Sequence, residues 1–411
     1  LLSLYEKMKE KCDREMEDFR FSSELTAVYI DPTDRCNANC PYCYVPVKTR
    51  KHGRSMTEKE LCFILEKIAN YFSAKGGSAS GGKGKAKKAV IIFHASEPLL
   101  VKEIIFKAID RFKQHFYFGI QTNGLLLEDK DIKFIKDNKV GIGISLDASN
   151  AEINNRSRFS ATHGGNFNKV IRAIDSFNGY EGLNVITTIT KLNVTNLPKL
   201  VRLLHKKKVP CVLINPVRLT QKNARSLRPD DKLMAKYFID AVQEAMRCSK
   251  GSEHKIIIGN FANIILGIIA PTARRLMCDI SPCGGGRCFL TITAGGDMIP
   301  CGEFIGLKGF RGGNIFRDSI DQAMVSEPFR KIRSRTVEKI DECDICTFRN
   351  ICGAPCPAEL HAFGNMHQKA VFCEFYKEII NYAFRLIAEG KEKYLLRKEG
   401  FANLNYQYKI S

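Results

Sequence analysis

The sequence lacks the features that would send the protein across a membrane or anchor it there. Its N-terminus shows no succession of charged, apolar and small residues of the kind that directs secretion. No stretch reaches the ~18 uninterrupted apolar residues that a spanning helix needs. The most apolar run, residues 256–270, is interrupted by Gly259, Asn260 and Asn263. We therefore expect a cytoplasmic protein with no membrane contact.

Acidic residues are missing from one long segment. Residues 182–229 contain ten Lys or Arg and no Asp or Glu, and the whole chain has a formal charge of +20. A basic surface attracts acidic peptides or nucleic acids, or simply keeps a protein soluble. No aromatic residues interrupt this segment, as they do in platforms that bind single-stranded nucleic acid. An acidic peptide is therefore a better expected partner than a nucleic acid.

Cysteine, in contrast, is abundant, with 16 among 411 residues. In a reducing compartment such a count indicates metal binding rather than disulfides. Cys36, Cys40 and Cys43 have C-x3-C-x2-C spacing directly after an expected strand at residues 27–31. Three thiolates can hold three irons of a [4Fe–4S] cluster and leave the fourth iron open, whereas an electron-transfer cluster normally has four cysteines. A zinc knuckle is the alternative.

The pattern around these cysteines predicts an α/β fold. Short β-rich segments alternate with amphipathic helical segments, which indicates a parallel sheet. Strands are expected at residues 27–31, 89–94, 116–122, 140–147, 184–190 and 212–215. Helices are expected at residues 57–71, 98–113, 129–137, 166–177, 197–207 and 230–248. Six such units are two fewer than a closed eight-stranded barrel contains.

The three-cysteine loop resembles that of the radical S-adenosylmethionine (SAM) superfamily, including the aromatic Tyr42 before its last cysteine. The resemblance implies a partial (β/α)6 TIM-like barrel. It also implies one [4Fe–4S] cluster, whose open iron is chelated by the amino and carboxylate groups of SAM at the carboxyl ends of the strands.

The resemblance also implies SAM contacts at the strand ends. Glu97-Pro98 matches the end of the family's Gly-Gly-Glu-Pro motif, although His94-Ala95-Ser96 departs from its glycines. Glu97 is expected to contact the SAM amino group, although it could simply complement the dipole of the following helix. The other residues expected near SAM are Tyr42, Asn123, Ser145, Asp147 and either Arg156 or Arg158. His94 is polar and stands at a strand end, but a lone histidine is more often structural.

A second set of cysteines resembles the SPASM domain. It consists of a C-x4-C pair, a G-x4-C segment, a C-x2-C-x5-C-x3-C segment and a final cysteine. The resemblance implies two auxiliary [4Fe–4S] clusters, three in total with the first. The ligands expected for one are Cys283, Cys288, Cys301 and Cys356, and for the other Cys343, Cys346, Cys352 and Cys373. Zinc is the alternative metal. Cys278 is left over, either as a replacement ligand or as a free thiol.

We expect the following division of the chain, with a closing helix over residues 374–397. It comprises an N-terminal helical segment (1–26), the partial barrel (27–250) with a flexible Gly/Ser/Lys insertion (73–88), a bridging helix (251–276), the SPASM domain (277–380) and a C-terminal helix and tail (381–411).

The resemblance implies an enzyme that cleaves SAM reductively and removes a hydrogen atom from a ribosomally made precursor peptide with an acidic leader. Flavodoxin or ferredoxin would supply the electron. A thioether crosslink from a cysteine sulfur to carbon is the expected product; carbon–carbon crosslinking and epimerisation would need the same residues.

Three other functions remain open on the sequence. Sulfatase maturases carry Asp directly after the G-x4-C thiol, whereas Gly302-Glu303 stands here. This argues against that activity unless Glu303 is a displaced acid. An iron–sulfur electron carrier and a nucleic-acid-modifying enzyme are the remaining alternatives. No catalytic acid or base can be assigned from the sequence.

Overall fold

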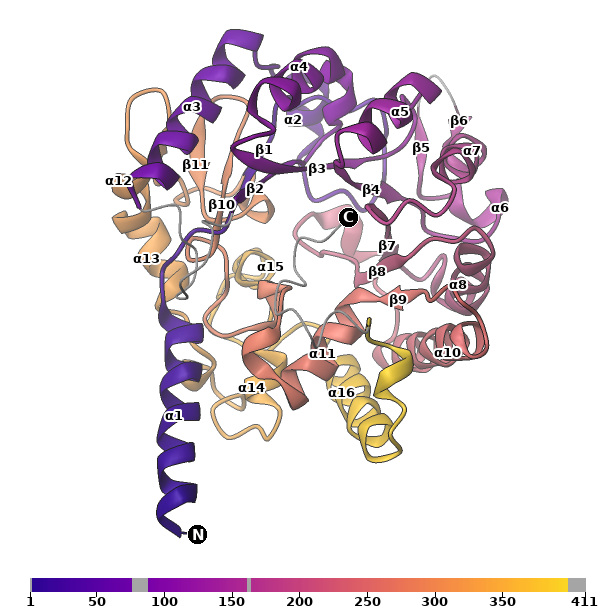
Figure 1. Cartoon of the computed structure of the whole chain (residues 1–411), viewed down its shortest axis with the longest axis vertical. Helices are drawn as coiled ribbons and strands as arrows, with labels where there is room; N and C mark the ends of the chain where they lie inside the picture. The colour runs from indigo at the N-terminus through magenta and orange to yellow at the C-terminus, as the bar shows by residue number, and fades with distance from the viewer. Residues whose placement is uncertain (1, 76–87, 161–163, 398–411) are drawn as a thin grey trace.

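The computed structural model describes residues 2–75, 88–160 and 164–397. Its framework is a ten-stranded sheet in which six parallel strands are consecutive neighbours. They are β1 (Ala27–Ile30), β2 (Ala89–Phe93), β3 (Phe116–Thr122), β4 (Gly141–Ser145), β7 (Leu183–Ile189) and β8 (Cys211–Pro216). All six expected strands are thus confirmed, and the sheet curves around a central space (Figure 1).

Amphipathic helices cover the outer face of this sheet. They are α3 (Glu58–Ala74), α4 (Lys102–Phe112), α5 (Asp129–Asp137), α7 (Phe167–Phe177), α8 (Leu197–Lys206) and α10 (Asp231–Ser249). In α7 the buried residues Val170, Ala173, Ile174 and Phe177 recur at the spacing of one helical face. The expected helices are therefore confirmed. Of the insertion expected at residues 73–88, residues 76–87 lie outside the described chain.

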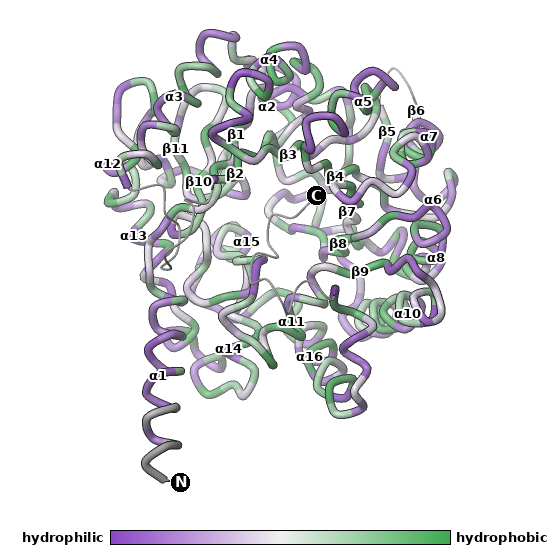
Figure 2. The backbone as a smooth tube through the Cα atoms, viewed as in Figure 1, coloured by the Kyte–Doolittle hydropathy of each residue, from purple (hydrophilic) through white to green (hydrophobic). Residues whose placement is uncertain are grey.

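Figure 2 shows hydrophobic segments along the strands and hydrophilic ones in the outer loops and along α1 (Leu2–Phe21). Among the described residues, no helix is both long and apolar enough to traverse a bilayer.

The sheet continues beyond both edges of the predicted barrel. β10 (Phe289–Ile292), from the cysteine-rich half, pairs in parallel with β1, and β11 (Asp297–Ile299) and β12 (Gly313–Asn314) follow in antiparallel order. At the other edge β9 (Ile257–Ile258) pairs with β8. One continuous sheet therefore contains strands from both sides of the domain boundary predicted at residue 277.

The remaining elements are short, apart from two buried helices. α11 (Gly259–Ile269) forms within the predicted bridging segment, and α16 (Cys373–Ala388) is the closing helix. α16 ends nine residues before the predicted end at residue 397, because Gly390 adopts φ +64° and the chain turns. The short helices are α2 (Val47–His52), α6 (Ala151–Asn154), α9 (Lys222–Arg225), α12 (Ile320–Val325), α13 (Glu327–Arg333), α14 (Arg349–Cys352) and α15 (Pro357–His361).

Single 3-10 turns and one small hairpin complete the described chain. The hairpin pairs β5 (Phe159–Ser160) with β6 (Gly164–Gly165). The turns are η1 (Pro98–Val101), η2 (Val194–Asn196), η3 (Pro271–Ala273), η4 (Met277–Asp279), η5 (Gly302–Phe304), η6 (Val337–Lys339) and η7 (Glu392–Tyr394).

Helix α1 extends away from the body and is held at its last turn (Figure 1). The Nη1 atom of Arg287, a residue only 1% exposed, donates to the carbonyl oxygens of Phe19 (3.0 Å) and Ser22 (3.1 Å). Arg20 Nε donates to the carbonyl oxygen of Ser281 (2.6 Å). The N-terminal helix is therefore fixed to the cysteine-rich half of the chain.

We predict that Arg287→Met destabilises the protein by about 2–3 kcal/mol, because the carbonyl groups of Phe19 and Ser22 lose a charged donor. The measurement is anaerobic urea unfolding followed by circular dichroism. Arg14→Met, on the exposed face of the same helix, is the control and should change stability by less than about 0.5 kcal/mol. Equal effects of the two variants would contradict this role for Arg287.

Candidate metal and cofactor site

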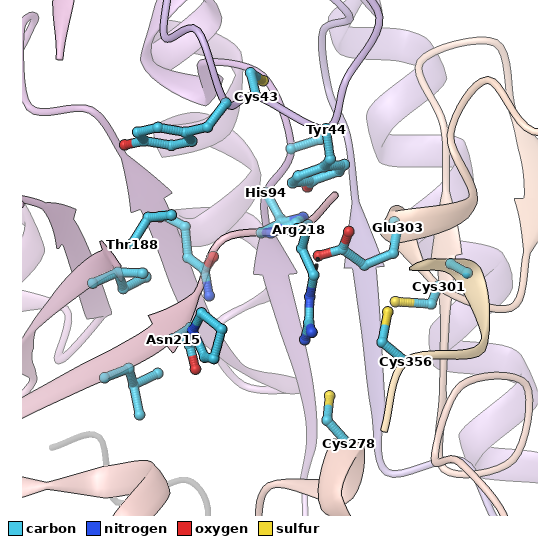
Figure 3. A pocket seen from close by; sticks show the side chains of 18 of the residues that line it. Cys43, Tyr44, His94, Thr188, Asn215, Arg218, Cys278, Cys301, Glu303 and Cys356 are labelled. Atoms are coloured by element: carbon cyan, nitrogen blue, oxygen red, sulfur yellow. Dashed lines mark ion pairs between the residues drawn. The ribbon is translucent and has the colours of Figure 1, made fainter. Parts of the chain in front are cut away.

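The carboxyl ends of the strands surround one cavity of about 390 Å³ (Figure 3). Its walls come from the three-thiol loop (residues 36–43), from the ends of β2, β3, β4 and β8, and from the cysteine-rich half. Seven thiols line it: Cys36, Cys40, Cys43, Cys278, Cys283, Cys301 and Cys356. Two groups of cysteines that are far apart in the sequence thus face the same space.

The three-thiol loop is held in shape by a buried arginine. Arg50 on α2 is 6% exposed, and it donates from Nε to the Val45 carbonyl oxygen (3.1 Å) and from Nη1 to the Ala38 carbonyl oxygen (3.2 Å). The Arg50 carbonyl oxygen in turn accepts from the Cys36 amide (3.2 Å). These bonds fix the loop backbone without using its thiols, which remain available as ligands.

The thiols of this loop suit an iron–sulfur cluster. Burial raises the pKa of Cys36 to about 12 and that of Cys40 to about 11, while Arg158 and Arg50 act in the opposite direction on Cys40. Metal binding would displace these thiol protons, and the two guanidinium groups would balance part of the resulting charge. The Ala38 amide also donates to Cys36 Sγ (3.4 Å).

The described side chains do not converge on a site for a single metal ion. Within the described residues, no three His, Cys, Asp or Glu side chains form a group able to hold one metal ion. Tetrahedral zinc with Zn–S bonds of about 2.3 Å requires such a group.

Glu97 follows β2 and is completely buried. It accepts hydrogen bonds from Thr122 Oγ1 (2.7 Å) and from the amides of Asn123 (2.8 Å) and Leu99 (3.0 Å). Burial raises its pKa to about 7. Glu97 therefore shapes the turn after β3 and caps η1, while its contact with SAM stays a prediction.

The motif before Glu97 preserves a glycine-like backbone without glycine. Ala95 has φ +71°, a conformation that costs an L-residue about 1–2 kcal/mol. Ser96 Oγ donates to the Asp34 carbonyl oxygen (2.7 Å), which ties this turn to the loop after β1. The departure from Gly-Gly thus changes the side chains but keeps a left-handed turn.

Asp147, expected near SAM, accepts hydrogen bonds from three other side chains. Its carboxylate accepts two from Arg158, at 2.9 Å from Nε and 3.2 Å from Nη2, one from the Tyr42 hydroxyl and one from Ser157 Oγ (3.2 Å). The Arg158 guanidinium lies 5.2 Å from the centre of the Tyr42 ring. Asp147 is 1% exposed, so it joins the three-thiol loop to β4 from beneath the cavity.

The structure distinguishes the two candidate arginines. Arg158 lines the cavity, whereas Arg156 is exposed and pairs with Glu152 (2.8 Å). Ser145 and Asn123 also line the cavity, and Asn123 Nδ2 donates to Asn37 Oδ1 (2.7 Å) beside Cys36. Of the residues expected near SAM, Arg158, Tyr42, Ser145 and Asn123 face the cavity.

Three of the four cysteines expected to bind the first auxiliary cluster line the cavity. Cys283, Cys301 and Cys356 line the cavity together with Cys278, while Cys288 is not part of its lining. Cys288 packs in a hydrophobic cluster with residues of β1, β2 and β10, and both Cys301, which packs against this cluster, and Cys283 are its neighbours. Burial raises the pKa of Cys301 well above its usual value, and the nearby thiolates of Cys278 and Cys283 contribute.

The second predicted ligand set is also brought together. Burial raises the pKa of Cys343, and the charges of Cys373 and Cys346 add to the shift. Burial raises the pKa of Cys352 to about 12, with contributions from Cys373 and Cys343. Cys343 and Cys373 thus lie near each other and near both Cys346 and Cys352, and none of the four lines the cavity.

Two charged residues in the cavity were not predicted to line it. Arg218 follows β8 and lies between Glu303 (3.6 Å) and Glu359 (3.7 Å). Glu303 follows Cys301, and burial raises its pKa. Arg218 could have been suspected from its place at a strand end, but its partners come from distant segments.

Comparisons with known proteins agree with this geometry. The radical SAM superfamily model matches residues 30–206, and the SPASM model, described as an iron–sulfur cluster-binding domain, matches residues 283–347. An uncharacterized protein of Archaeoglobus fulgidus is 43% identical over 396 residues, which are 96% of this chain and 90% of that protein. A cysteine-type anaerobic sulfatase-maturating enzyme of Clostridium novyi is 22% identical, covering 86% of this chain and 93% of that enzyme.

Two solved structures share the fold. Native anSMEcpe with bound AdoMet has a TM-score of 0.74 at 21% identity and covers 89% of this chain and 99% of its own. Streptococcus suis SuiB bound to precursor peptide SuiA has a TM-score of 0.62 at 15% identity and covers 90% of this chain and 81% of its own.

We predict that Arg158→Lys weakens SAM binding at least about 10-fold, because lysine cannot keep the two-bond fork to Asp147 and also face the cavity. Equilibrium dialysis against labelled SAM, on anaerobically reconstituted protein, measures the effect. Arg156→Lys is the matched control and should bind SAM like the wild type. Weaker SAM binding by Arg156→Lys than by Arg158→Lys would contradict the placement of Arg158.

Proposed function

Because the chain belongs to the radical SAM superfamily and carries a C-terminal SPASM domain, we propose that it matures a cysteine-containing peptide or protein by forming a thioether bond. Members of this family are enzymes that modify peptides or proteins. The observation that carries the proposal is the single cavity shared by the three-thiol loop and the C-terminal thiols. A substrate cysteine in that cavity would lie near both sets.

Cys36, Cys40 and Cys43 would hold the cluster that binds SAM, and when bound the pair would supply a carbon-centred radical able to remove a hydrogen atom. The residues of this chain bind and orient. Arg158, fixed by Asp147, offers a guanidinium to the SAM carboxylate. Asn123 and Ser145 offer polar groups to the same ligand. The apolar walls exclude water around the substrate carbon, so that proximity selects the bond that reacts.

Two auxiliary clusters in the C-terminal half complete the proposed cofactors. For the one facing the cavity we propose Cys278, Cys283, Cys301 and Cys356 as ligands, with Cys278 in place of Cys288. The supporting observation is that these four thiols share the cavity wall, whereas Cys288 packs among apolar side chains. For the other we propose Cys343, Cys346, Cys352 and Cys373.

A matched pair of variants tests this ligand assignment. Cys278→Ala should lower the iron content from about twelve to about eight irons per chain, because one four-iron cluster loses a ligand. Cys288→Ala should keep about twelve. Anaerobic iron and sulfide determination measures both. Loss of iron only from Cys288→Ala would restore the ligand set expected from the sequence.

The name of the Clostridium novyi relative, a cysteine-type anaerobic sulfatase-maturating enzyme, suggests the second candidate, for which we propose oxidation of a cysteine in the substrate protein. Glu303 favours it, because this buried acid stands two residues after Cys301 and faces the cavity. Both candidates remove a hydrogen atom from carbon and a proton from sulfur, so they share the requirements of the cavity. The mass of the product separates them: both lose two hydrogens, but only the thioaldehyde of cysteine oxidation hydrolyses further to an aldehyde.

The function is tested with synthetic cysteine peptides that carry an acidic N-terminal half, incubated with reconstituted enzyme, SAM and dithionite. We expect 5′-deoxyadenosine and a peptide that is lighter by two hydrogens and resists thiol alkylation. The triple variant of Cys36, Cys40 and Cys43 to Ala should form no 5′-deoxyadenosine while keeping about eight irons. 5′-Deoxyadenosine formation by that variant would refute the radical SAM site.

A further inference from the structure

Five side chains with a buried polar atom lie in or beside the wall of the cavity, between the three-thiol loop and Cys301. Within the described chain, each has a polar atom without a hydrogen-bond partner: Asp31 (Oδ1 and Oδ2), Tyr44 (hydroxyl), His94 (Nδ1), Thr291 (Oγ1) and Glu303 (Oε2). An unpaired buried polar group costs about 1–3 kcal/mol. Such a concentration in one place calls for a functional explanation.

Asp31 and His94 form the centre of this group. They follow neighbouring parallel strands, and the His94 amide donates to the Ile30 carbonyl oxygen (3.0 Å), which places the two side chains side by side. His94 Nδ1 lies 4.0 Å from Asp31 Oδ1. The Asp31 side chain is 2% exposed and that of His94 is 22% exposed, so the aspartate lies behind the histidine.

Two tyrosines hold the imidazole in this orientation. Tyr29 contacts it edge-on, with ring centres 5.4 Å apart at 79°, and Tyr44 stacks on it at 6.5 Å and 18°. Nδ1 is buried and lies toward Asp31, and the His94 side chain lines the cavity (Figure 3). We therefore assign Nδ1 to Asp31 and the other ring nitrogen, Nε2, to the substrate.

We propose that His94 and Asp31 form a proton relay that takes the proton from a substrate cysteine thiol in the cavity and transfers it to Asp31. This inference rests on the proposed function. His94 accepts the proton at Nε2 while its Nδ1 proton moves to Asp31. Hydrogen bonds of this kind are often long without substrate and shorten in the reacting complex.

With the relay, every hydrogen atom, electron and proton released in the proposed reaction has an acceptor. The substrate C–H and S–H bonds break and a C–S bond forms. The hydrogen atom goes to the 5′-deoxyadenosyl radical, one electron goes to an oxidised [4Fe–4S] cluster of the C-terminal thiols, and the remaining proton goes to His94. Cysteine oxidation releases the same hydrogen atom, electron and proton while a C=S bond forms, so the relay serves either product.

The electrostatic setting supports this direction of transfer. Burial and the charge of Asp34 raise the pKa of Asp31 well above its usual value, while burial lowers the pKa of His94 to about 4. A proton arriving through the imidazole therefore settles on Asp31 rather than on the ring. The other titratable neighbours of the imidazole are Tyr29, Tyr44 and Glu303. Glu303 comes directly after Gly302, whose backbone lies beside the ring.

The relay makes product formation depend on pH. Asp31 can accept a proton only when it is ionised, so product formation should rise with pH through its raised pKa, while 5′-deoxyadenosine formation without peptide should not follow it.

The test compares reconstituted wild type, His94→Ala, Asp31→Asn and the exposed control His115→Gln. With the cysteine peptide, we expect the ratio of modified peptide to 5′-deoxyadenosine to fall about 100-fold in both relay variants and to stay unchanged in the control. Peptide-free 5′-deoxyadenosine formation should stay within about 2-fold in all four. Added imidazole should restore the ratio in His94→Ala, which a merely structural role would not allow. An unchanged ratio in His94→Ala, or a loss confined to Glu303→Gln, would overturn the relay.

A second measurement needs no substrate. Infrared difference spectra of anaerobic holoprotein, wild type minus Asp31→Asn, should show a carboxylic-acid C=O band that disappears with a midpoint well above the usual carboxyl value of about 3.9. Absence of that band at every pH above the usual carboxyl value of about 3.9 would overturn the relay by itself. If wild type forms no 5′-deoxyadenosine, the proposed function fails, and the infrared result still decides whether Asp31 carries the proton.

Discussion

The parallel pairing of β1 with β10 is the constraint on which the site depends. Parallel strands present their carboxyl ends at one edge of a sheet. β1 leads into the three-thiol loop, and β10 stands between the C-terminal cysteine pair and Cys301. Their register places residues 27–30 beside residues 289–292, so cysteines more than 200 positions apart share one cavity. Without this pairing the two halves would be separate iron–sulfur domains.

Buried residues behind the cavity wall position the charged groups of the cavity. Asp147 fixes Arg158, and Arg50 fixes the backbone of the three-thiol loop, so that cations stand near thiols that must lose their protons to bind iron. On the opposite wall Arg218 lies between Glu303 and Glu359. The unpartnered groups concentrate between these two walls, around Asp31 and His94. Polar groups that are paired provide the framework, and those left unpaired mark where substrate chemistry can take place.

Much of the fold could be predicted from the sequence because its signals are local. Apolar periodicity identified the six strands and their helices, and cysteine spacing identified the metal-binding loops. The end of α16 was misplaced because the amphipathic pattern continues past Gly390, where the backbone turns. Cys278 and Cys288 could not be separated by spacing, since four residues lie between each of them and Cys283. Only packing shows that Cys278 lines the cavity while Cys288 lies in a hydrophobic cluster.

The sequence by itself determined the family, the parallel α/β architecture and the residue types able to bind iron and SAM, because these depend on short motifs and on periodicity. The tertiary structure decided which members of each motif face the ligand. It turned Arg158 inward and Arg156 outward, used Asp147 as a support, and joined Glu303 to Arg218. It also placed Asp31 behind His94, so that a histidine that looked solitary in the sequence has an acidic partner. These contacts join segments that are distant in the chain, and no local pattern encodes them.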